Sequence, residues 1–281
     1  MARAPTRTLL LAAAALTGFA ANSLLCRAAL ASRSIDAGSF TLVRLAAGAA
    51  ALGVLSRARG QRGPAGTSLV PAAALFTYAI AFSYAYLRLT TGTGALILFG
   101  AVQLTMIAAG IKAGERPPFA AWLGLTLAAA GLLALTFPGL SAPDPLGATL
   151  MATAGIAWGL YSLRGRGAPD PLAMTARNFA LGAPLAALVW VVAATKGNAH
   201  ADLRGVALAV ASGAIASGVG YSLWYAALRG LTTTRAAVVQ LSVPVLAAAS
   251  AVLFLGEPIS PRLAWSGAAI LGGIALVLRA R

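Results

Sequence analysis

Few side chains in this chain could carry out covalent or metal chemistry. The sequence holds one cysteine, Cys26, and one histidine, His200, among its 281 residues. Zinc sites take three or four such ligands, so we expect no metal site and no cofactor. An intramembrane protease would need a buried Ser–His pair or paired aspartates. Because His200 falls in a predicted loop and all six acidic residues fall near the ends of apolar segments, we expect no catalytic residues and no enzyme.

Amide side chains within apolar segments are the first candidates for binding. Asn22, Gln103 and Gln240 each lie inside a long apolar run. An amide that faced lipid would lose its hydrogen bonds, so these side chains are expected to face the interior of a helix bundle. There they would line a cavity and contact a substrate.

Aromatic residues form the second group of candidates. Tyr78, Phe82 and Tyr86 follow one another at steps of four, which places them on one face of a helix. The aromatic residues predicted to contact substrate, beside the amides, are Tyr78, Phe82, Phe99, Trp158, Tyr161, Tyr221 and Trp224. A second interpretation stays open, because aromatic stripes also mark helix packing or the lipid interface.

Pro244 lies inside an apolar run, four residues after Gln240. Proline has no N–H to donate to the backbone carbonyl of Gln240 and clashes with that carbonyl, so we expect a kink in the helix. A freed carbonyl at membrane depth must face protein or water, so Pro244 is a predicted hinge beside a cavity. The alternative is a kink that serves helix packing only, in which Ser242 donates a hydrogen bond to the freed carbonyl.

Two arginines, Arg44 and Arg177, also fall inside apolar runs. We expect a structural role for both, in which they hold carbonyl groups near helix ends. The alternative is that they bind a substrate carboxylate near a gate.

The elements that must position these residues follow from composition. The chain is 59% hydrophobic and 10% charged, whereas soluble domains carry about 25% charged residues. Its net charge of +15 comes from arginines and lysines that lie singly or in small groups between apolar runs. Basic loops of a membrane protein explain this pattern better than a nucleic-acid surface, which would cluster basic residues with aromatics. We therefore expect the lipid bilayer, and not nucleic acid, as a partner.

Apolar runs between glycine, proline and charged residues predict ten membrane spans, each near the about 20 residues that a bilayer requires. The spans are 8–30, 37–55, 68–87, 90–112, 118–137, 145–163, 172–195, 203–227, 232–255 and 261–279. The first span resembles a signal peptide after Arg3 and Arg7, but its apolar core is too long, so we expect it to be retained. The predicted fold class is all-α and integral to the membrane.

The basic residues also predict the orientation. If the N-terminus is cytoplasmic, thirteen Lys and Arg residues fall on the cytoplasmic side and six on the outer side. Because cytoplasmic loops are enriched in Lys and Arg, we expect a multi-pass protein with both termini in the cytoplasm.

A repeated phrase divides the chain into two halves. Gly114-Glu115 follows the fourth span and Gly256-Glu257 follows the ninth, and "LTT" occurs at both 89–91 and 231–233. The predicted domains are two five-helix repeats, 8–137 and 145–279. Five is odd, so the second repeat would be inverted in the membrane, an arrangement of secondary transporters that encloses a central cavity and supports alternating access. The two Gly-Glu phrases are interpreted as turns at the membrane surface.

In these features the chain resembles the EamA family of the drug/metabolite transporter superfamily. The resemblance rests on ten spans in two halves, on Gly-Glu phrases followed by proline, and on Trp158-Gly159, and it departs from the family at Phe19-Ala20. Within that family the chain is most similar to YddG-type amino-acid exporters. The resemblance implies a protein of the bacterial inner membrane, with a basket of helices whose cavity is lined mainly by spans 1, 3, 4, 6, 8 and 9.

We therefore predict a secondary transporter that exports amino acids, aromatic and neutral ones included, and similar small metabolites. No carboxylate lies within a span, so a cation exporter that depends on a membrane carboxylate is disfavoured. The alternative substrates are lipophilic drugs and nucleotide-sugar-like metabolites, the latter of which would need a more basic cavity.

Overall fold

The structure is a computed structural model, and it describes residues 6–60, 69–114, 118–137, 142–165, 170–231 and 239–279. Over these ranges the chain is helical, and the β-type contact is an isolated antiparallel bridge between Ile35 and Ala201. The predicted turn residue Glu115 lies outside the described ranges. The expected all-α class is confirmed for the part of the chain that is described.

The helices follow the predicted spans closely. The first half contains α1 (Thr6–Ala31), α2 (Ala37–Ala58), α3 (Val70–Tyr86), α4 (Thr91–Lys112) and α5 (Phe119–Thr136). The second half contains α6 (Pro145–Gly165), α7 (Pro171–Thr195), α8 (Leu203–Val210), η1 (Ala211–Val219), α9 (Gly220–Leu228), α11 (Ser242–Leu255) and α12 (Pro261–Arg279). Apart from the ninth span, every predicted end lies within three residues of the observed one.

Helix ends are defined by aspartates and glycines, which explains where the scarce acidic residues lie. The side chains of Asp36, Asp170 and Asp202 each accept the backbone N–H three residues later, at the starts of α2, α7 and α8. This is the N-cap bond that satisfies an otherwise unpaired donor. At the other end, Gly256 closes α11 in the left-handed conformation, with φ of +66°. That conformation favours glycine, as the sequence predicts for this position.

The outer surface of the bundle is apolar. Among the described residues, seven helices are long and apolar enough to cross a membrane, and α3, α11 and α12 are shorter apolar helices. Side chains such as Leu253 and Trp265 are each 78% exposed, which is expected for residues that contact lipid. The chain is therefore a multi-pass membrane protein.

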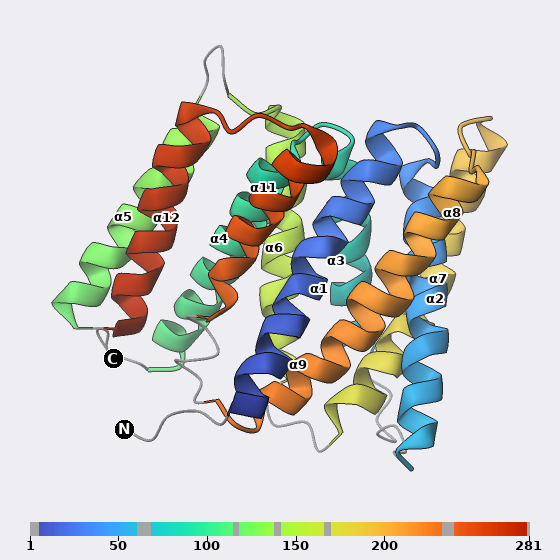
Figure 1. Ribbon diagram of the computed structural model, residues 1–281, viewed down its shortest axis with the longest axis horizontal. Helices are drawn as coiled ribbons and strands as arrows, with labels where there is room; N and C mark the ends of the chain where they lie inside the picture. The colour runs from blue at the N-terminus through green and yellow to red at the C-terminus, as the bar shows by residue number, and fades with distance from the viewer. Residues whose placement is uncertain are drawn as a thin grey trace.

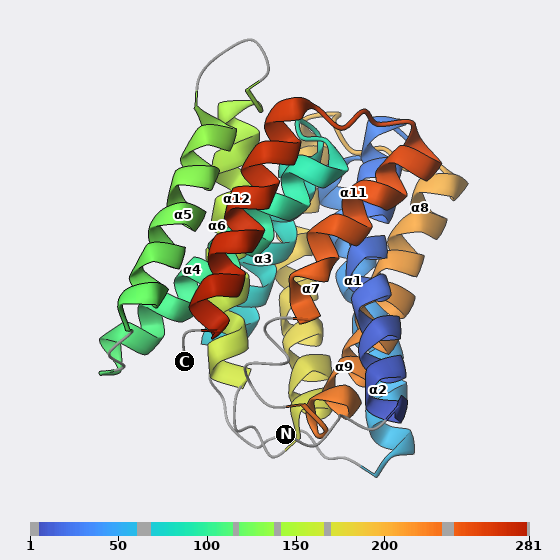
Figure 2. The same cartoon turned by 60° about the vertical axis from the view of Figure 1, so that its left-hand side comes forward.

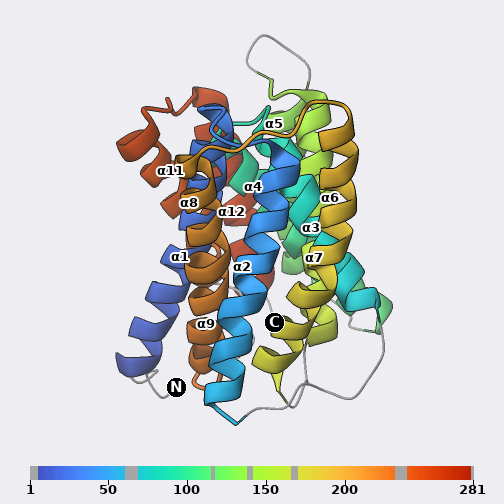
Figure 3. The same ribbon diagram turned by 90° about the vertical axis from the view of Figure 1, so that its right-hand side faces the viewer.

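The two halves interleave in space. Helix α5 packs along α12, α2 packs along α7, and α6 lies against both α3 and α4. Helix α1 packs against α9 and α11 (Figures 1 and 2). Figure 3 shows α2 beside the continuous rod formed by α8, η1 and α9. Because each half contacts mainly the other half, the interior between them is built from both.

We call the side of the bundle on which α1 ends the upper side, as drawn in Figure 1. The first turn of α1 and the last turn of α12 both lie toward the lower side (Figures 1 and 2). Helix α6 runs from the upper to the lower side, opposite to α1 (Figure 1).

Candidate functional site

A pocket lies in the interior between the two halves. It is lined by Phe19, Asn22, Ser23, Tyr78, Phe82, Leu98, Phe99, Trp158, Ala216, Ser217, Tyr221 and Gln240. These residues come from α1, α3, α4, α6, η1 and α9, with Gln240 just before α11. They belong to the six predicted spans that the family resemblance associates with a cavity. The empty space among these residues, including the part open to the outside, is about 450 Å³.

Seven of the ten residues predicted to contact substrate line this pocket, namely Asn22, Tyr78, Phe82, Phe99, Trp158, Tyr221 and Gln240. The other three do not line it. Tyr161 is buried and donates a hydrogen bond to Thr175, and Trp224 packs edge-on against Phe19. Gln103 is buried, and its Nε2 atom has no hydrogen-bond partner within the described residues.

The aromatic residues form one continuous wall, so the packing and binding interpretations of the stripe are not exclusive. Trp158 is stacked on Tyr221, with centroids 5.3 Å apart, and its ring also lies 4.9 Å from that of Tyr78. On the far side of Tyr221, Phe19 lies at 5.7 Å. Trp158 is half-buried and so presents part of its ring to the pocket. Such π faces attract cations and pack against apolar side chains.

Sequence reasoning missed Phe19 and Ser23 of α1, and Ser217 of η1, as lining residues. The two α1 residues could have been found, because Phe19 and Ser23 flank Asn22 within one helical turn on the same face. The η1 residue could not, because nine residues of the eighth span form a π-helix. A π-helix widens the turn and shifts the register of the side chains that follow.

This π-helix places Ser212 against Asn22. The Ser212 hydroxyl donates to Oδ1 of Asn22 at 2.6 Å, and Nδ2 of Asn22 donates to the Tyr78 hydroxyl at 3.3 Å. The neighbouring Gly213 brings η1 close to α2, because a Cβ there would stand 2.2 Å from the Arg44 carbonyl oxygen. Asn22 therefore links α1, α3 and η1 across the pocket and orients Tyr78.

Arg44 is 1% exposed and lies behind Tyr78. Its Nη2 donates to the Tyr78 hydroxyl at 2.9 Å, and its guanidinium carbon lies 5.1 Å from the ring centroids of both Tyr78 and Phe82. Both rings line the pocket. The other predicted arginine, Arg177, is half-buried on α7 and does not line the pocket.

The ninth predicted span is interrupted next to the pocket. Val239 and Gln240 are helical, Leu241 is a turn, and α11 begins at Ser242, so Pro244 lies in the first turn of α11. The helix is thus interrupted at Leu241, three residues before the proline, although Leu241 keeps right-handed helical φ and ψ. Ser242 stabilises the break because its hydroxyl donates to the Val239 carbonyl at 2.7 Å. Residues 232–238 of this span lie outside the described ranges.

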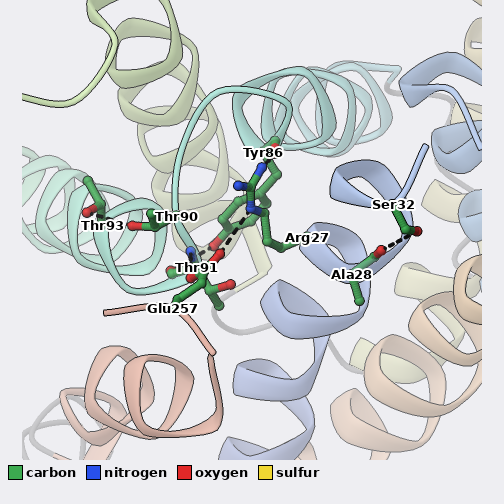
Figure 4. Close-up of polar contacts among 8 residues, drawn as sticks. All are labelled: Arg27, Ala28, Ser32, Tyr86, Thr90, Thr91, Thr93 and Glu257. Atoms are coloured by element: carbon green, nitrogen blue, oxygen red, sulfur yellow. Dashed lines mark hydrogen bonds and ion pairs between the residues drawn. The ribbon is translucent and has the colours of Figure 1, made fainter. Parts of the chain in front are cut away.

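Above the pocket, polar contacts join the two halves (Figure 4). Arg27 of α1 forms an ion pair with Glu257 at 3.0 Å and donates to the Tyr86 carbonyl at 2.8 Å. The other carboxylate oxygen of Glu257 accepts the N–H of Thr91 at 2.7 Å. We call Arg27, Tyr86, Thr91 and Glu257 the upper clasp. It lies one helical turn beyond Phe82, whose ring packs edge-on against Tyr86, so it lies between the pocket and the upper side.

A second upper contact joins the connection before α2 to the connection before α8. Asp36 N–H donates to the His200 carbonyl at 3.0 Å, and Asp202 N–H donates to the Ser34 carbonyl at 2.8 Å. Burial alone would raise the pKa of Asp36, but hydrogen bonds from Ser39 and the His200 N–H outweigh it and lower that pKa. The carboxylate of Asp36 is therefore stabilised in its charged form.

Comparisons with known proteins agree with this architecture. The model of the EamA-like transporter family matches residues 145–279. An uncharacterized protein of Pseudomonas aeruginosa is 55% identical over 276 residues, which cover 98% of this chain and 96% of that protein. A protein of known crystal structure superposes with a TM-score of 0.66 at 22% identity, over 94% of this chain and 95% of that one. This last similarity concerns the fold alone.

Proposed function

The chain belongs to the EamA-like transporter family, and from that premise we propose that it is a YddG-type exporter of amino acids and similar small metabolites. The family makes it a membrane transporter of the drug/metabolite type. The finer assignment to amino acids, with aromatic and neutral ones included, depends on the chemistry of the pocket.

The observation that carries the proposal is an aromatic pocket whose polar groups are all uncharged. Six of its twelve lining side chains are aromatic, and none carries a formal charge. Ring faces such as those of Trp158 and Tyr221 suit both an ammonium group and an apolar side chain. The Tyr78 hydroxyl and the Gln240 amide supply hydrogen bonds. A zwitterion with an apolar side chain matches this combination.

We propose that residues 8–137 and 145–279 form two inverted repeats of five helices. The packing supports this proposal, because its main contacts between helices recur when the halves are exchanged. If α1 corresponds to α6, and α3 to the α8–η1–α9 rod, then the contact of α1 with α9 corresponds to that of α6 with α3. The contacts of α1 with α11 and of α6 with α4 correspond in the same way. The opposite directions of α1 and α6 also fit an inversion.

Exchange of the two conformations would then produce alternating access. The upper clasp lies between the pocket and the upper side, so we infer that it must open before substrate can leave on that side. We place the upper side outside the cytoplasm and both termini inside, in the bacterial inner membrane, because more basic residues then lie in cytoplasmic loops.

The test is the uptake of a panel of radiolabelled amino acids by liposomes that contain the purified protein. We expect accumulation of neutral and aromatic amino acids, each competing with the others. Accumulation of a lipophilic dye or a nucleotide sugar without any amino acid would overturn the amino-acid assignment. The matched variants are Trp158→Ala in the pocket and Trp265→Ala on the lipid-facing surface.

A further inference from the structure

Arg44 is a buried cation whose charge is not balanced by a carboxylate within the described residues. Its Nε and Nη1 atoms have no hydrogen-bond partner there. The ion pairs in the described ranges involve Arg27 and Arg88 instead. A guanidinium taken out of water needs an anion or a full set of acceptors. The expected structural role, in which Arg44 would hold backbone carbonyls, leaves these two donors unexplained.

The guanidinium lies directly behind one wall of the pocket. It contacts Tyr78 through a hydrogen bond of 2.9 Å, and it lies 5.1 Å from the ring centroids of Tyr78 and Phe82. Those two rings separate it from the pocket that they line. An anion in the pocket beside them would feel this charge through one layer of side chains, where water screens it poorly.

The Tyr78 hydroxyl connects Arg44 to the pocket. With the Asn22 amide in its observed orientation, the hydroxyl oxygen accepts one hydrogen bond from Arg44 and one from Asn22. Within the described residues it donates none, so its own hydrogen needs an acceptor. A phenol that accepts a bond from a guanidinium is polarised and becomes a stronger donor.

We propose that Tyr78 and Arg44 form an anion-binding end of the pocket that takes the carboxylate of the substrate. The carboxylate accepts the O–H of Tyr78. Arg44 supplies the balancing charge, and Asn22 and Ser212 hold Tyr78 in place. The ammonium group then lies toward the ring faces of Trp158 and Tyr221. This assignment rests on the proposed transport function and specifies it, because substrates must carry a carboxylate.

Three related compounds test the proposal on the full chain in liposomes or detergent. L-phenylalanine carries both charged groups, phenethylamine lacks the carboxylate, and 3-phenylpropionate lacks the ammonium. We expect phenylalanine to bind at least about tenfold more tightly than phenethylamine, because a hydrogen bond to a charged group is worth that much or more. Tyr78→Phe should bring the ratio of these two affinities close to one.

Tyr161→Phe is the matched control, because Tyr161 is also a buried tyrosine but donates to Thr175 outside the pocket. It should leave the ratio unchanged. Arg44→Lys should preserve part of the ratio and Arg44→Gln should abolish it. A merely structural arginine would alter stability in these variants without altering the preference between the two compounds.

The outcomes separate this proposal from the proposed function. If phenylalanine binds, but Tyr78→Phe leaves its affinity relative to phenethylamine unchanged, the anion site is overturned and amino-acid transport still stands. If 3-phenylpropionate binds in a Tyr78-dependent way and phenylalanine does not bind, the anion site stands and amino-acid transport is overturned. Equal binding of phenethylamine and phenylalanine by the unmodified protein contradicts the anion site directly, and binding of none of the three compounds contradicts both proposals.

Discussion

Arg27 and Glu257 stand 230 residues apart in the chain and meet in an ion pair of 3.0 Å. Each also bonds to the backbone of the α3–α4 region, Arg27 to the Tyr86 carbonyl and Glu257 to the Thr91 N–H. The pair therefore joins the end of α1, the end of α11 and the start of α4. It lies above the pocket, where both halves must separate if the upper side is to open.

The first prediction concerns the upper clasp. Glu257→Gln keeps the shape of the side chain and removes the charge, so the clasp should open more often. Cys26 is a buried native cysteine next to Arg27 and reports on such opening. We expect its alkylation by a small maleimide to be about tenfold faster, since hydrogen bonds to charged groups contribute about 1.5–3 kcal/mol. Cys26→Ala supplies the unlabelled control, and an unchanged rate would show that the clasp does not control access.

A second prediction concerns the contact between α2 and η1. A Cβ on Gly213 would lie 2.2 Å from the Arg44 carbonyl oxygen, whereas a Cβ on Gly272 would meet nothing within 4 Å. Gly213→Ala should therefore destabilise the protein by about 1–3 kcal/mol or more through overpacking. Gly272→Ala should leave the melting temperature unchanged or raise it, because alanine favours helix. Thermal unfolding in detergent compares the two, and equal melting temperatures would contradict the close packing.

A third prediction concerns the aromatic wall. Trp158→Ala removes the ring that stacks on Tyr221 at 5.3 Å and contacts Tyr78 at 4.9 Å. Substrate binding should weaken by about tenfold, because aromatic contacts are worth about 0.5–1.5 kcal/mol beyond the area that they bury. Trp265→Ala removes an equal volume from a residue that is 78% exposed, and it should bind like the unmodified protein. If both variants lost substrate binding equally, the loss would come from removing any large aromatic side chain and not from the pocket.

A fourth prediction concerns pH. The folded-state pKa of Asp36 is lowered, so its carboxylate contributes stability that is present above the unfolded pKa of about 3.9. That contribution is lost as the pH falls through the folded-state value. The melting temperature of Asp36→Asn should therefore be lower by a constant few degrees from pH 8 to pH 5, and the difference should shrink below about pH 4. A difference that grew on acidification would contradict the assignment.

The helices could be predicted from the sequence because a bilayer requires long apolar runs and the scarce charged residues mark their ends. The position of Asn22 could also be predicted, since an amide has nowhere to face but the interior. Its partner Ser212 could not, because the π-helix that carries it has no signature in the apolar pattern.

Glu257 illustrates the same limit. The sequence predicts a turn at the membrane surface around Gly256-Glu257, and in the structure the Glu257 carboxylate accepts an N–H at the start of a helix, where negative charge is favourable. The helix is α4, however, and not the one that follows Glu257 in the chain. Long-range pairs of this sort, like Arg44 with Tyr78, depend on how the apolar segments pack, and local composition does not encode that packing.

The central claim is that the pocket carries amino acids across the membrane by alternating access. Counterflow tests it most directly, with liposomes that contain the protein and a high internal concentration of unlabelled L-phenylalanine, and with trace radiolabelled phenylalanine outside. The account predicts transient accumulation of label without any ion gradient, lost in Trp158→Ala and retained in Trp265→Ala. No accumulation above protein-free liposomes, or equal accumulation in both variants, would contradict it.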